Sequence, residues 1–565
     1  MTTGGSRLRD GAALTAVAVI LVVYFTWPLA LRPGTLGRVD SEGDGQFSIW
    51  NVAWVAHAIL SPDARVFDAN IFHPHRGTLA YSEANLGAGV LAVPGYWLTR
   101  NPYVAHNTAV LIGLTLSVVG MYLLGFRLSG SRPGALVAAI VFSFCPFLFA
   151  HTAHIQLLML GPLPFVLLAL HAFVERATPV RASLLGLAIG MQALFCAYWG
   201  VLAGLLVGVG VLFYSVSRGL WRSPRWWILT CVAAVVSAVT VLPFFLPYMD
   251  VQQEGFGRTL AEAGVYSSTW RDYLTSSAWM HDWMLPWLKR RGGWVEVLFP
   301  GFAALILGGA GVMAAIRERD GGGESASTIR ETTIFYLLVA ALALWISFGP
   351  AAGLYSVLFH TVPVFSLLRA PARFGVAVTL ALAVLSSFGV RWILASQSAE
   401  RRTWIAAAIV GVTALDLSMT MPFRRVAPFP KAYEVIARSR PGPVAEFPFF
   451  YQGADFYRHS RYMLGSTVHW QPLINGYSDH IPPDFVEMTV PISSFPNPEG
   501  FDILRARRAR YVVFHLALYS ARSREALLKR IEAYSAYLRP LAQENDVWLF
   551  EIADWPEQHP DLSGR

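Results

Sequence analysis

The sequence predicts an α-helical polytopic membrane protein with about eleven spanning helices, followed by a small α/β domain. Two observations support this prediction. Apolar residues make up 55% of the 565 residues and charged residues only 14%, whereas soluble domains carry about 25% charged residues. The mean hydropathy is +0.45, and apolar runs of about 20 residues, the length that crosses a bilayer, recur along the chain.

The expected spans share this length and a near absence of charge. They lie near 11–31, 104–127, 133–150, 155–174, 182–198, 200–217, 226–248, 295–316, 332–348, 373–394 and 403–421. The region 182–217 also admits a different division. The first run follows Arg7 and Arg9 and lacks a small-residue cleavage site after it, so we expect a retained span.

Arginine residues indicate the orientation, because Lys and Arg are enriched on the cytoplasmic side. The loops at 151–154 and 198–200 contain neither residue, whereas alternate loops carry Arg127 and Arg132, Arg176 and Arg181, Arg218, Arg222 and Arg225, Arg317, Arg319 and Arg330, and Arg391, Arg401 and Arg402. We therefore expect a protein of the cytoplasmic (inner) membrane with its N-terminus inside and its C-terminal domain outside.

The net charge of +8 does not indicate a nucleic-acid partner, because the Arg residues are spread over several loops. The three Cys residues all lie in apolar runs. An odd number in such positions argues against a disulfide framework.

Two domains are expected. Residues 1–421 form the transmembrane domain, with long outside loops at 32–103 and 250–294, and residues 422–565 form the α/β domain. Within the latter, 444–447, 510–515 and 547–552 are expected to be strands, and 430–438 and 523–538 helices. Within the first loop, 46–60 is predicted to be a helix on the membrane surface, because Phe47, Trp50, Trp54 and Ala58 recur at helical spacing. A second surface or re-entrant helix is expected at 85–98.

The spans contain few ionisable residues, Asp416 and His171 being the main ones. Ion-coupled transporters keep such groups inside the membrane, so their scarcity directs attention to the outside loops.

The first loop contains three carboxylates in five residues, Asp40, Glu42 and Asp44. One of them can act as a general base at the membrane surface while another tunes it or binds a metal. The alternative is that Asp44 caps the helix that follows.

Further along the same loop lie His73, His75, Arg76 and Glu83. A His-x-His pair can bind a metal when a third ligand is near, or can make ordinary hydrogen bonds within the loop. Glu83 can cap the next helix or belong to a site.

Arg369 and Arg373 flank Pro371 at the expected start of a span, which is a typical phosphate site. Anchoring to lipid headgroups is the alternative, as it is for the basic cluster Lys289–Arg291.

In the C-terminal domain, the segment 467–477 contains His469, Asn475 and Tyr477. Aromatic and polar groups together suit a sugar. The same segment can instead rest against the membrane.

These motifs together resemble the GT-C superfamily of glycosyltransferases. The resemblance rests on Gly43-Asp44 with Trp50 and Trp54, on 72–79 (FHPHRGTL) with Ser82-Glu83, on 368–374 (LRAPARF), and on 475–478 (NGYS). It is closest to a group of bacterial multi-spanning proteins classed near that superfamily. The chain lacks the paired Asp-Glu at the first-span exit that is typical of the mannosyltransferases.

The resemblance implies transfer of a sugar from a polyprenyl-phosphate donor at the outer membrane face, with a first-loop Asp as base. By position Asp44 fits the base best, Asp40 is second, and Glu83 is a further catalytic candidate. The expected substrate contacts are Trp50, His73, His75, Arg76, Arg369, Arg373, His469, Asn475 and Tyr477. The sugar, the acceptor and the use of a divalent metal stay open. The alternative function is a non-catalytic protein that handles lipid or polymer during envelope assembly or transport.

The orientation can be tested by fusing reporters to the C-terminus at Arg565. Arg residues are concentrated in the predicted inner loops. We therefore expect a periplasm-active reporter such as alkaline phosphatase to be active when fused at Arg565, and a cytoplasm-active reporter at the same position to be inactive. Activity of the cytoplasmic reporter alone would overturn the orientation.

Overall fold

The computed structural model describes residues 4–39, 43–253, 257–288, 296–317, 324–544 and 546–557. The chain forms two compact units. Unit 1 consists of Met1–Leu31, Val110–Leu246 and Gly255–Pro422, and unit 2 of Arg32–Ala109, Pro247–Glu254 and Phe423–Arg565. Two long helices, α4 (Pro102–Ser129) and α11 (Pro224–Gln253), contribute to both units. The first loop, which the sequence analysis counted with the transmembrane domain, thus shares its unit with the C-terminal segment.

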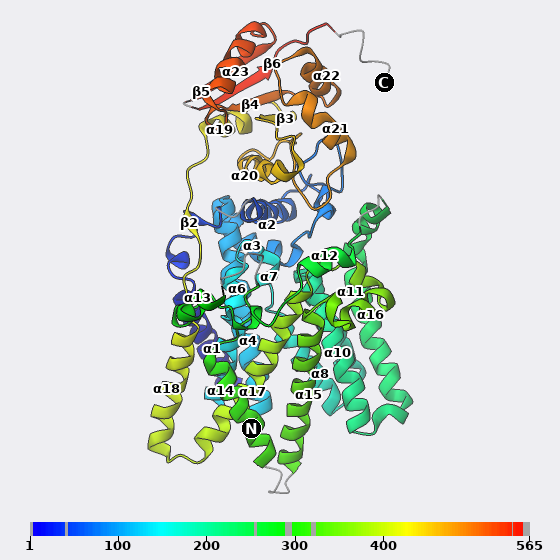
Figure 1. Ribbon diagram of the computed structural model, residues 1–565, viewed down its shortest axis with the longest axis vertical. Helices are drawn as coiled ribbons and strands as arrows, with labels where there is room; N and C mark the ends of the chain where they lie inside the picture. Colours follow the sequence, from blue (N-terminus) through cyan, green and yellow to red (C-terminus); the bar gives the residue numbers. More distant parts are fainter. Residues whose placement is uncertain are drawn as a thin grey trace. The chain divides into compact units, whose positions relative to one another are not determined.

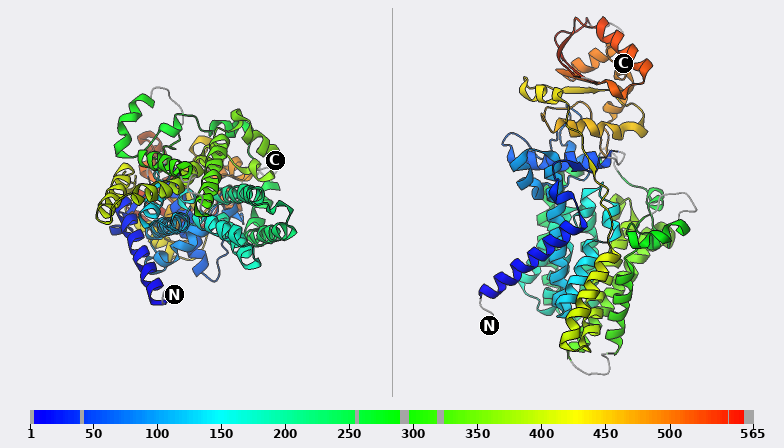
Figure 2. Two further views of the ribbon diagram at one scale, coloured as in Figure 1. Left: turned by 90° about the horizontal axis from the view of Figure 1, so that it is seen from below. Right: turned by 90° about the vertical axis from the view of Figure 1, so that its left-hand side faces the viewer.

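Unit 1 is built from helices, several of which run side by side (Figures 1 and 2). Besides its parts of α4 and α11, its longer helices are α1 (Gly4–Phe25), α5 (Arg132–Ser143), α8 (Leu163–Glu175), α9 (Pro179–Phe195), α10 (Ala197–Ser217), α14 (Phe302–Arg317), α15 (Glu324–Ser347), α17 (Val376–Ala395) and α18 (Ala399–Asp416), with the short α6 (Pro146–Ala150) and α7 (Ile155–Leu158) extending α5 and α8. Every expected span overlaps a helix. Among the described residues, 7 helices are long and apolar enough to cross a membrane, so the count of about eleven stays a prediction.

Glycines allow α14 and α17 to pack closely. A Cβ atom at Gly311 would lie 2.0 Å from the carbonyl oxygen of Leu385, and one at Gly389 would lie 2.0 Å from that of Leu307. No side chain fits in so short a gap. Small residues at such crossings let helices approach where water supplies no hydrophobic driving force between them.

Apart from its first residues, which fall in unit 2, the second long loop belongs to unit 1. It contains α12 (Leu260–Val265), η4 (Asp272–Leu274), η5 (Trp279–Met284) and α13 (Leu285–Leu288). Its large apolar side chains are exposed, with Trp279, Trp283 and Trp287 each more than half accessible. Tryptophan is enriched at membrane interfaces. The basic cluster Lys289–Arg291 lies outside the described residues.

Unit 2 contains a sheet of four strands in the order β3-β4-β6-β5. They are β3 (Val444–Phe447), β4 (Tyr511–His515), β5 (Leu538–Glu544) and β6 (Val547–Ile552). β3 is parallel to β4, with Val444 opposite Tyr511, and the other two pairs are antiparallel. The helices of this region are α19 (Lys431–Arg438), α20 (Ser460–Ser466), α21 (Pro483–Ile492), α22 (Pro498–Ala506) and α23 (Ala521–Ala533). The three expected strands are confirmed, whereas β5 was missed because its first residues were taken as the end of a helix.

The first loop contributes α2 (Asp44–Leu60) and α3 (Leu86–Thr99) to unit 2. The prediction that α2 lies exposed on a membrane surface is wrong. Trp50 is 1% exposed and Trp54 is 5% exposed, and their indole N–H groups donate to the Asn70 side chain and to the carbonyl of Val66. All residues from 48 to 56 are buried, including the polar Asn51, so no face of this stretch is left for a membrane surface.

Backbone hydrogen bonds join the first loop to the C-terminal segment within unit 2. The amides of Phe72 and His73 donate to the carbonyls of Asn475 and Leu473, and the amide of Leu473 donates to Asn70. Residues 472–474 in turn bond to Val444 of β3. The Asn70 side chain accepts from Trp50 and donates to the Ser466 hydroxyl and the carbonyl of Gln471. One buried side chain therefore connects three segments that are distant in the sequence.

The side chain of Asn475 is fully buried and satisfies both backbone groups of Glu446 in β3. Replacing Asn475 with Ala leaves these groups without a partner, which costs about 1–3 kcal/mol each. For a unit of this size we expect a melting temperature lower by about 4–12 °C, measured by thermal unfolding of the purified protein. Gln452 is exposed, and Gln452→Ala serves as the control. Equal melting temperatures for the two variants would contradict this role of Asn475.

Candidate functional site

The most unusual buried charge in unit 1 is Glu296, which precedes α14 and is 2% exposed. Its backbone is fixed because the amides of Leu298 and Phe299 donate to the carbonyls of Asp272 and Thr275. Its Oε1 atom lies 3.0 Å from Nε2 of His151. Its Oε2 atom is buried without a hydrogen-bond partner among the described residues.

Burial alone would raise the pKa of the Glu296 carboxyl, but His151 and Arg373 together outweigh burial and hold it below its usual value. Asp272 lies on the other side of this loop, and its carboxylate accepts from the amides of Thr269 and Glu296. Here burial is the larger effect and raises the pKa of Asp272. The environments of Glu296 and Asp272 therefore shift their pKa values in opposite directions, and the environment of Glu296 favours the ionised form.

Arg373 is half-buried at the start of α17 and lies over the ring of Tyr198, 5.2 Å from its centroid. The Tyr198 hydroxyl donates to the carbonyl of Ala370, so one tyrosine positions both the guanidinium and the turn that carries it. Arg369 lies 5.0 Å from the centroid of Tyr266. Pro371 opens the 3₁₀ turn η9 (Pro371–Gly375), which leads into α17 without a side-chain cap at either start.

Two predicted site residues, Arg369 and Arg373, thus share one turn. For Arg373, no carboxylate lies within ion-pair distance among the described residues. A guanidinium placed on an aromatic ring without a carboxylate at ion-pair distance is a favourable setting for a phosphate.

In unit 2, Asp44 lies in the first turn of α2 and is partly buried. The cap position belongs to Gly43, whose φ is 99°. A Cβ at Gly43 would lie 2.7 Å from the carbonyl oxygen of Tyr457, so only glycine fits there. The alternative that Asp44 is the cap is therefore wrong. Its charge can still favour the helix start through the dipole.

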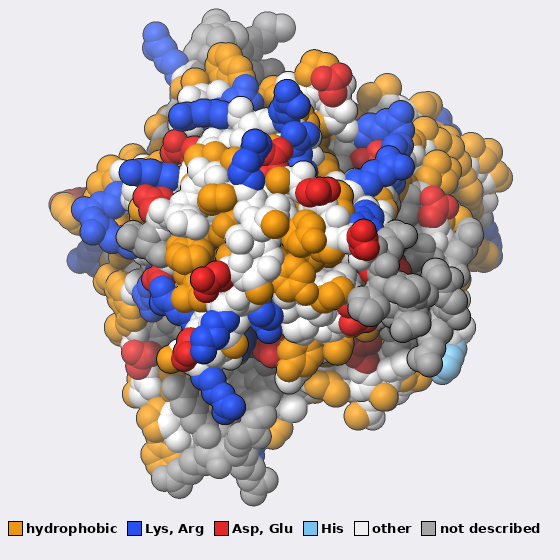
Figure 3. Space-filling view, turned by 90° about the horizontal axis from the view of Figure 1, so that it is seen from above, with side chains coloured by type: hydrophobic (Ala, Val, Ile, Leu, Met, Phe, Trp, Pro, Cys, Tyr) orange, Lys and Arg blue, Asp and Glu red, His pale blue; other side chains and the backbone are white. Residues whose placement is uncertain are grey.

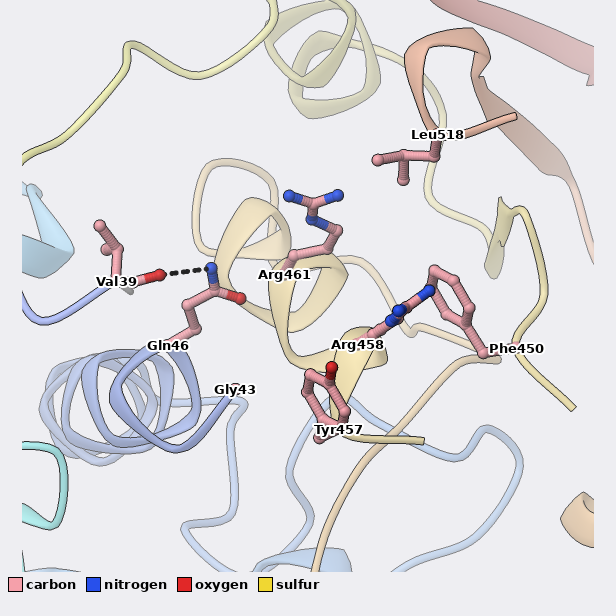
Figure 4. Close-up of a pocket in the computed structure, with 8 residues that line it drawn as sticks. All are labelled: Val39, Gly43, Gln46, Phe450, Tyr457, Arg458, Arg461 and Leu518. Atoms are coloured by element: carbon pink, nitrogen blue, oxygen red, sulfur yellow. Dashed lines mark hydrogen bonds between the residues drawn. The ribbon is translucent and has the colours of Figure 1, made fainter. Parts of the chain in front are cut away.

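A cavity of about 340 Å³ lies beside this helix start. Figure 4 shows its lining residues, Val39, Gly43, Gln46, Phe450, Tyr457, Arg458, Arg461 and Leu518. Gln46 donates to the carbonyl of Val39. Arg458 pairs with Asp455, whereas Arg461 is exposed and has no ion-pair partner among the described residues.

Asp40, the second candidate base, lies outside the described residues, as does Glu42. Both belong to the segment between Val39 and Gly43, which line this cavity. Glu83 is partly buried, and its backbone carbonyl accepts from the side chains of Asn51 and Asn85.

The histidine motif is attached to the C-terminal segment. His75 pairs with the carboxylate of Asp484 at 2.9 Å. Arg507 pairs with the same carboxylate at 2.8 Å, and Arg507 also donates a hydrogen bond to the carbonyl of His73. Burial and the nearby Arg507 and Arg508 lower the pKa of His73. These contacts favour the interpretation of loop hydrogen bonding. Arg76 is exposed.

Other predicted contacts lie in the interior of unit 2. Trp50 and Asn475 are fully buried with their polar atoms bonded. His469 is 8% exposed, and burial lowers its pKa to about 3. Tyr477 is half-buried and packs edge-on against Phe47. A direct role in sugar binding for these residues stays a prediction.

Sequence reasoning missed Glu296 and its partner His151. The signal was present, because Glu296 falls inside the expected span 295–316, where an acidic residue is costly. Asp416, which was noted, accepts from His281 and from the amide of Ala303. His281 is fully buried and also bonded to Ser276. This Ser-His-Asp chain has no exposed member that could meet a substrate, so it holds the second loop to α14 and α18.

Metal binding was left open by the sequence. Among the described residues, no three His, Cys, Asp or Glu side chains gather as a metal site requires. We therefore name no metal ligand.

The face in Figure 3 shows basic and acidic side chains intermixed. Exposed pairs of this kind include Arg438 with Glu434 and Lys529 with Glu525. A mixed pattern differs from the one-sided basic surface of nucleic-acid-binding proteins.

Among solved structures, the chain is similar to the Archaeoglobus fulgidus oligosaccharyltransferase in complex with Zn and sulfate, with a TM-score of 0.50, 12% identity, and coverage of 95% of this chain and 73% of that one. It is also similar to the archaeal oligosaccharyltransferase AglB from Archaeoglobus fulgidus in complex with an inhibitory peptide and a dolichol-phosphate (TM-score 0.47, 12% identity, coverage 94% and 72%). A third match is ArnT from Cupriavidus metallidurans in the apo state (TM-score 0.47, 15% identity, coverage 97% and 98%).

The first of these similarities supports the expected fold, a protein with several long apolar helices and a small C-terminal sheet domain. At 12% identity it establishes the fold alone. No family model and no curated protein matches the chain.

The ionised state of Glu296 can be tested by replacing it with Gln. A group with a lowered pKa stabilises the fold above its unfolded pKa, near 4.3, and this stabilisation is lost as the pH falls through the folded value. At pH 7 we expect Glu296→Gln to lower the melting temperature by about 2–8 °C. The difference from the parent should shrink from about pH 5 to pH 3. Glu400→Gln, at an exposed carboxylate, should differ little from the parent throughout. A difference for Glu296→Gln that does not change with pH would refute the assignment.

Proposed function

We propose that this chain is a membrane glycosyltransferase that transfers a sugar from a polyprenyl-phosphate-linked donor to an acceptor outside the cytoplasm. The observation that supports it best is Arg373, a guanidinium held over the ring of Tyr198 in the turn before α17, with no carboxylate at ion-pair distance among the described residues. The fold supports the same class, because the similar Archaeoglobus fulgidus structure is an oligosaccharyltransferase.

In this proposal, Arg373 binds the phosphate of the donor and Arg369 assists it. A guanidinium can offer two parallel N–H bonds to a phosphate, and the amides at the start of α17 add partial positive charge. Glu296 and His151 keep the surrounding backbone and charge in place. The apolar spans provide the environment for the polyprenyl chain.

Asp44 acts as the general base. Its carboxylate removes the proton of an acceptor hydroxyl, whose oxygen forms a bond to the anomeric carbon of the sugar. The bond from that carbon to the phosphate oxygen breaks, and the phosphate leaves with the bonding electrons. Direct displacement of this kind inverts the anomeric configuration. Cations near the leaving phosphate stabilise the charge that develops on it.

The position of Asp44 supports this role. It lies in the first turn of α2 next to a glycine that occupies the cap, so the carboxylate is not required as the cap. The neighbouring cavity is lined by Gly43, Arg458 and Arg461 and offers space for an acceptor beside the start of α2.

The experiment first establishes sugar transfer from a polyprenyl-phosphate donor by the purified protein and then compares Asp44→Asn with the parent. Asn keeps the size of the side chain and removes the basic carboxylate. We expect the rate to fall by about 10²–10⁴-fold, the usual contribution of a positioned base, while donor binding and melting temperature stay close to those of the parent. Asp63→Asn, at an exposed residue of the same loop, should keep full activity.

Donor binding is measured in the same preparations with a polyprenyl-phosphate analogue. Arg373→Ala should weaken binding of the analogue by at least about 10-fold. Arg373→Lys should recover only part of this loss, because an ammonium group cannot offer the two parallel N–H bonds of a guanidinium. Arg222 also lies over an aromatic ring, that of Trp221, and Arg222→Ala should bind like the parent. Normal turnover by Asp44→Asn would show that Asp44 is not the base. Donor binding without any sugar transfer by the parent protein would instead favour a lipid-handling protein over an enzyme.

A further inference from the structure

A second cavity in unit 2 is lined by none of the residues assigned to sugar transfer. Its volume is about 560 Å³, within the usual range of small-molecule sites. It is formed by the end of α3, one face of α2 and the loop after α20. Its lining residues are His57, Tyr96, Thr99, Arg100, Asn101, Pro102, Phe429, Thr467, Val468 and Trp470.

One wall of the cavity is a fixed aromatic platform. The rings of His57 and Trp470 are stacked, with centroids 4.6 Å apart and an interplanar angle of 14°. Trp470 donates its indole N–H to the Tyr96 hydroxyl at 2.8 Å, and Trp54 packs against its edge. Burial and the nearby Arg100 lower the pKa of His57 to about 4, so the platform is uncharged at neutral pH.

The cavity also contains one cation. The guanidinium of Arg100 lies over the ring of Tyr96, 5.3 Å from its centroid. Arg100 is exposed, and no carboxylate lies within ion-pair distance of it among the described residues. Tyr96 therefore connects the platform and the cation, because it contacts both Trp470 and Arg100.

Two residues of this cavity have backbone conformations that are rare for side chains of their size. The φ angle is 54° at Arg100 and 53° at Trp470. At Arg100 this conformation ends α3, where the amide of Arg100 donates to the carbonyl of Tyr96. At Trp470 it lies in the loop after α20, and left-handed conformations at non-glycine residues are concentrated at functional sites.

We propose that this cavity binds an acidic sugar, a pyranose that carries a carboxylate or a phosphate. The apolar face of the sugar ring would lie on the aromatic platform, and its anionic group would meet Arg100. Threonine and asparagine groups at the rim can contact the hydroxyls. The site does not depend on sugar transfer, and it gives unit 2 the ability to hold an anionic glycan.

The test measures binding of soluble probes to the purified full chain by titration calorimetry, without donor and without turnover. The probes are glucuronic acid, glucose 6-phosphate, glucose and inorganic phosphate. We expect at least one of the acidic sugars to bind at least about 10-fold more tightly than either glucose or phosphate. The stronger of the two acidic probes identifies the anionic group.

Arg100→Gln should remove the preference for the acidic sugar, and because Arg100 is exposed the variant should fold normally. Trp470→Leu should weaken the binding of all three sugars to a similar extent. Trp470→Phe should weaken it less, because an aromatic ring is kept. The matched controls are Arg65→Gln and Trp97→Leu, at exposed residues that do not line the cavity.

Three outcomes would overturn the proposal. They are absence of binding of both acidic sugars, unchanged preference in Arg100→Gln, and binding of anionic phospholipid vesicles but of no soluble sugar. Each is independent of the outcome for Asp44, because the assay contains no transfer reaction.

Discussion

The fold of unit 2 depends on the hydrogen bonding of Asn70. Its amide group connects Trp50 of α2, Ser466 of α20 and the backbone at Gln471. Its own carbonyl accepts from Leu473, which continues the backbone bonding toward β3. Because a buried amide must have all its partners, this one side chain fixes the relation between the first loop and the C-terminal segment. The start of α2, with Asp44, is positioned as a consequence.

A comparable constraint applies to Glu296 in unit 1. A buried carboxylate is tolerated only where cations and hydrogen bonds replace water. His151 and Arg373 supply them, and the backbone bonds between 298–299 and 272–275 keep the chain in place. The turn with Arg369 and Arg373 is held independently by two tyrosine hydroxyls, Tyr198 on Ala370 and Tyr355 on Leu368. The guanidinium groups are thus placed before any ligand arrives.

Much of this architecture could be predicted from the sequence, because apolar length and strand composition are local properties. The helices of unit 1 and the strands β3, β4 and β6 follow directly from them. The surroundings of α2 could not be predicted in this way. Its tryptophans suit a membrane surface equally well, and only the distant partners Asn70 and Val66 reveal that they are buried. Asn475 and Glu296 also have surroundings that depend on partners distant in the sequence. Asn475 was predicted to contact a sugar, and its side chain also bonds to both backbone groups of Glu446 in β3. Glu296 was not singled out, yet its carboxylate lies 3.0 Å from His151.

The distribution of paired and unpaired charges separates structural from ligand-binding groups. Where acidic residues are buried, as at Glu296, Asp416 and Glu446, each has a histidine at hydrogen-bond distance. Arg100, Arg461 and Arg373 differ, because no carboxylate lies within ion-pair distance of them among the described residues, although Arg373 acts on Glu296 from a longer distance. Two of the three are oriented by a tyrosine ring, which fixes the position of a guanidinium without neutralising its charge. A protein whose purpose was stability alone would gain by pairing these cations, whereas an anionic ligand requires that their charge be left available. This pattern favours phosphate and acidic sugar groups as the molecules that complete the structure.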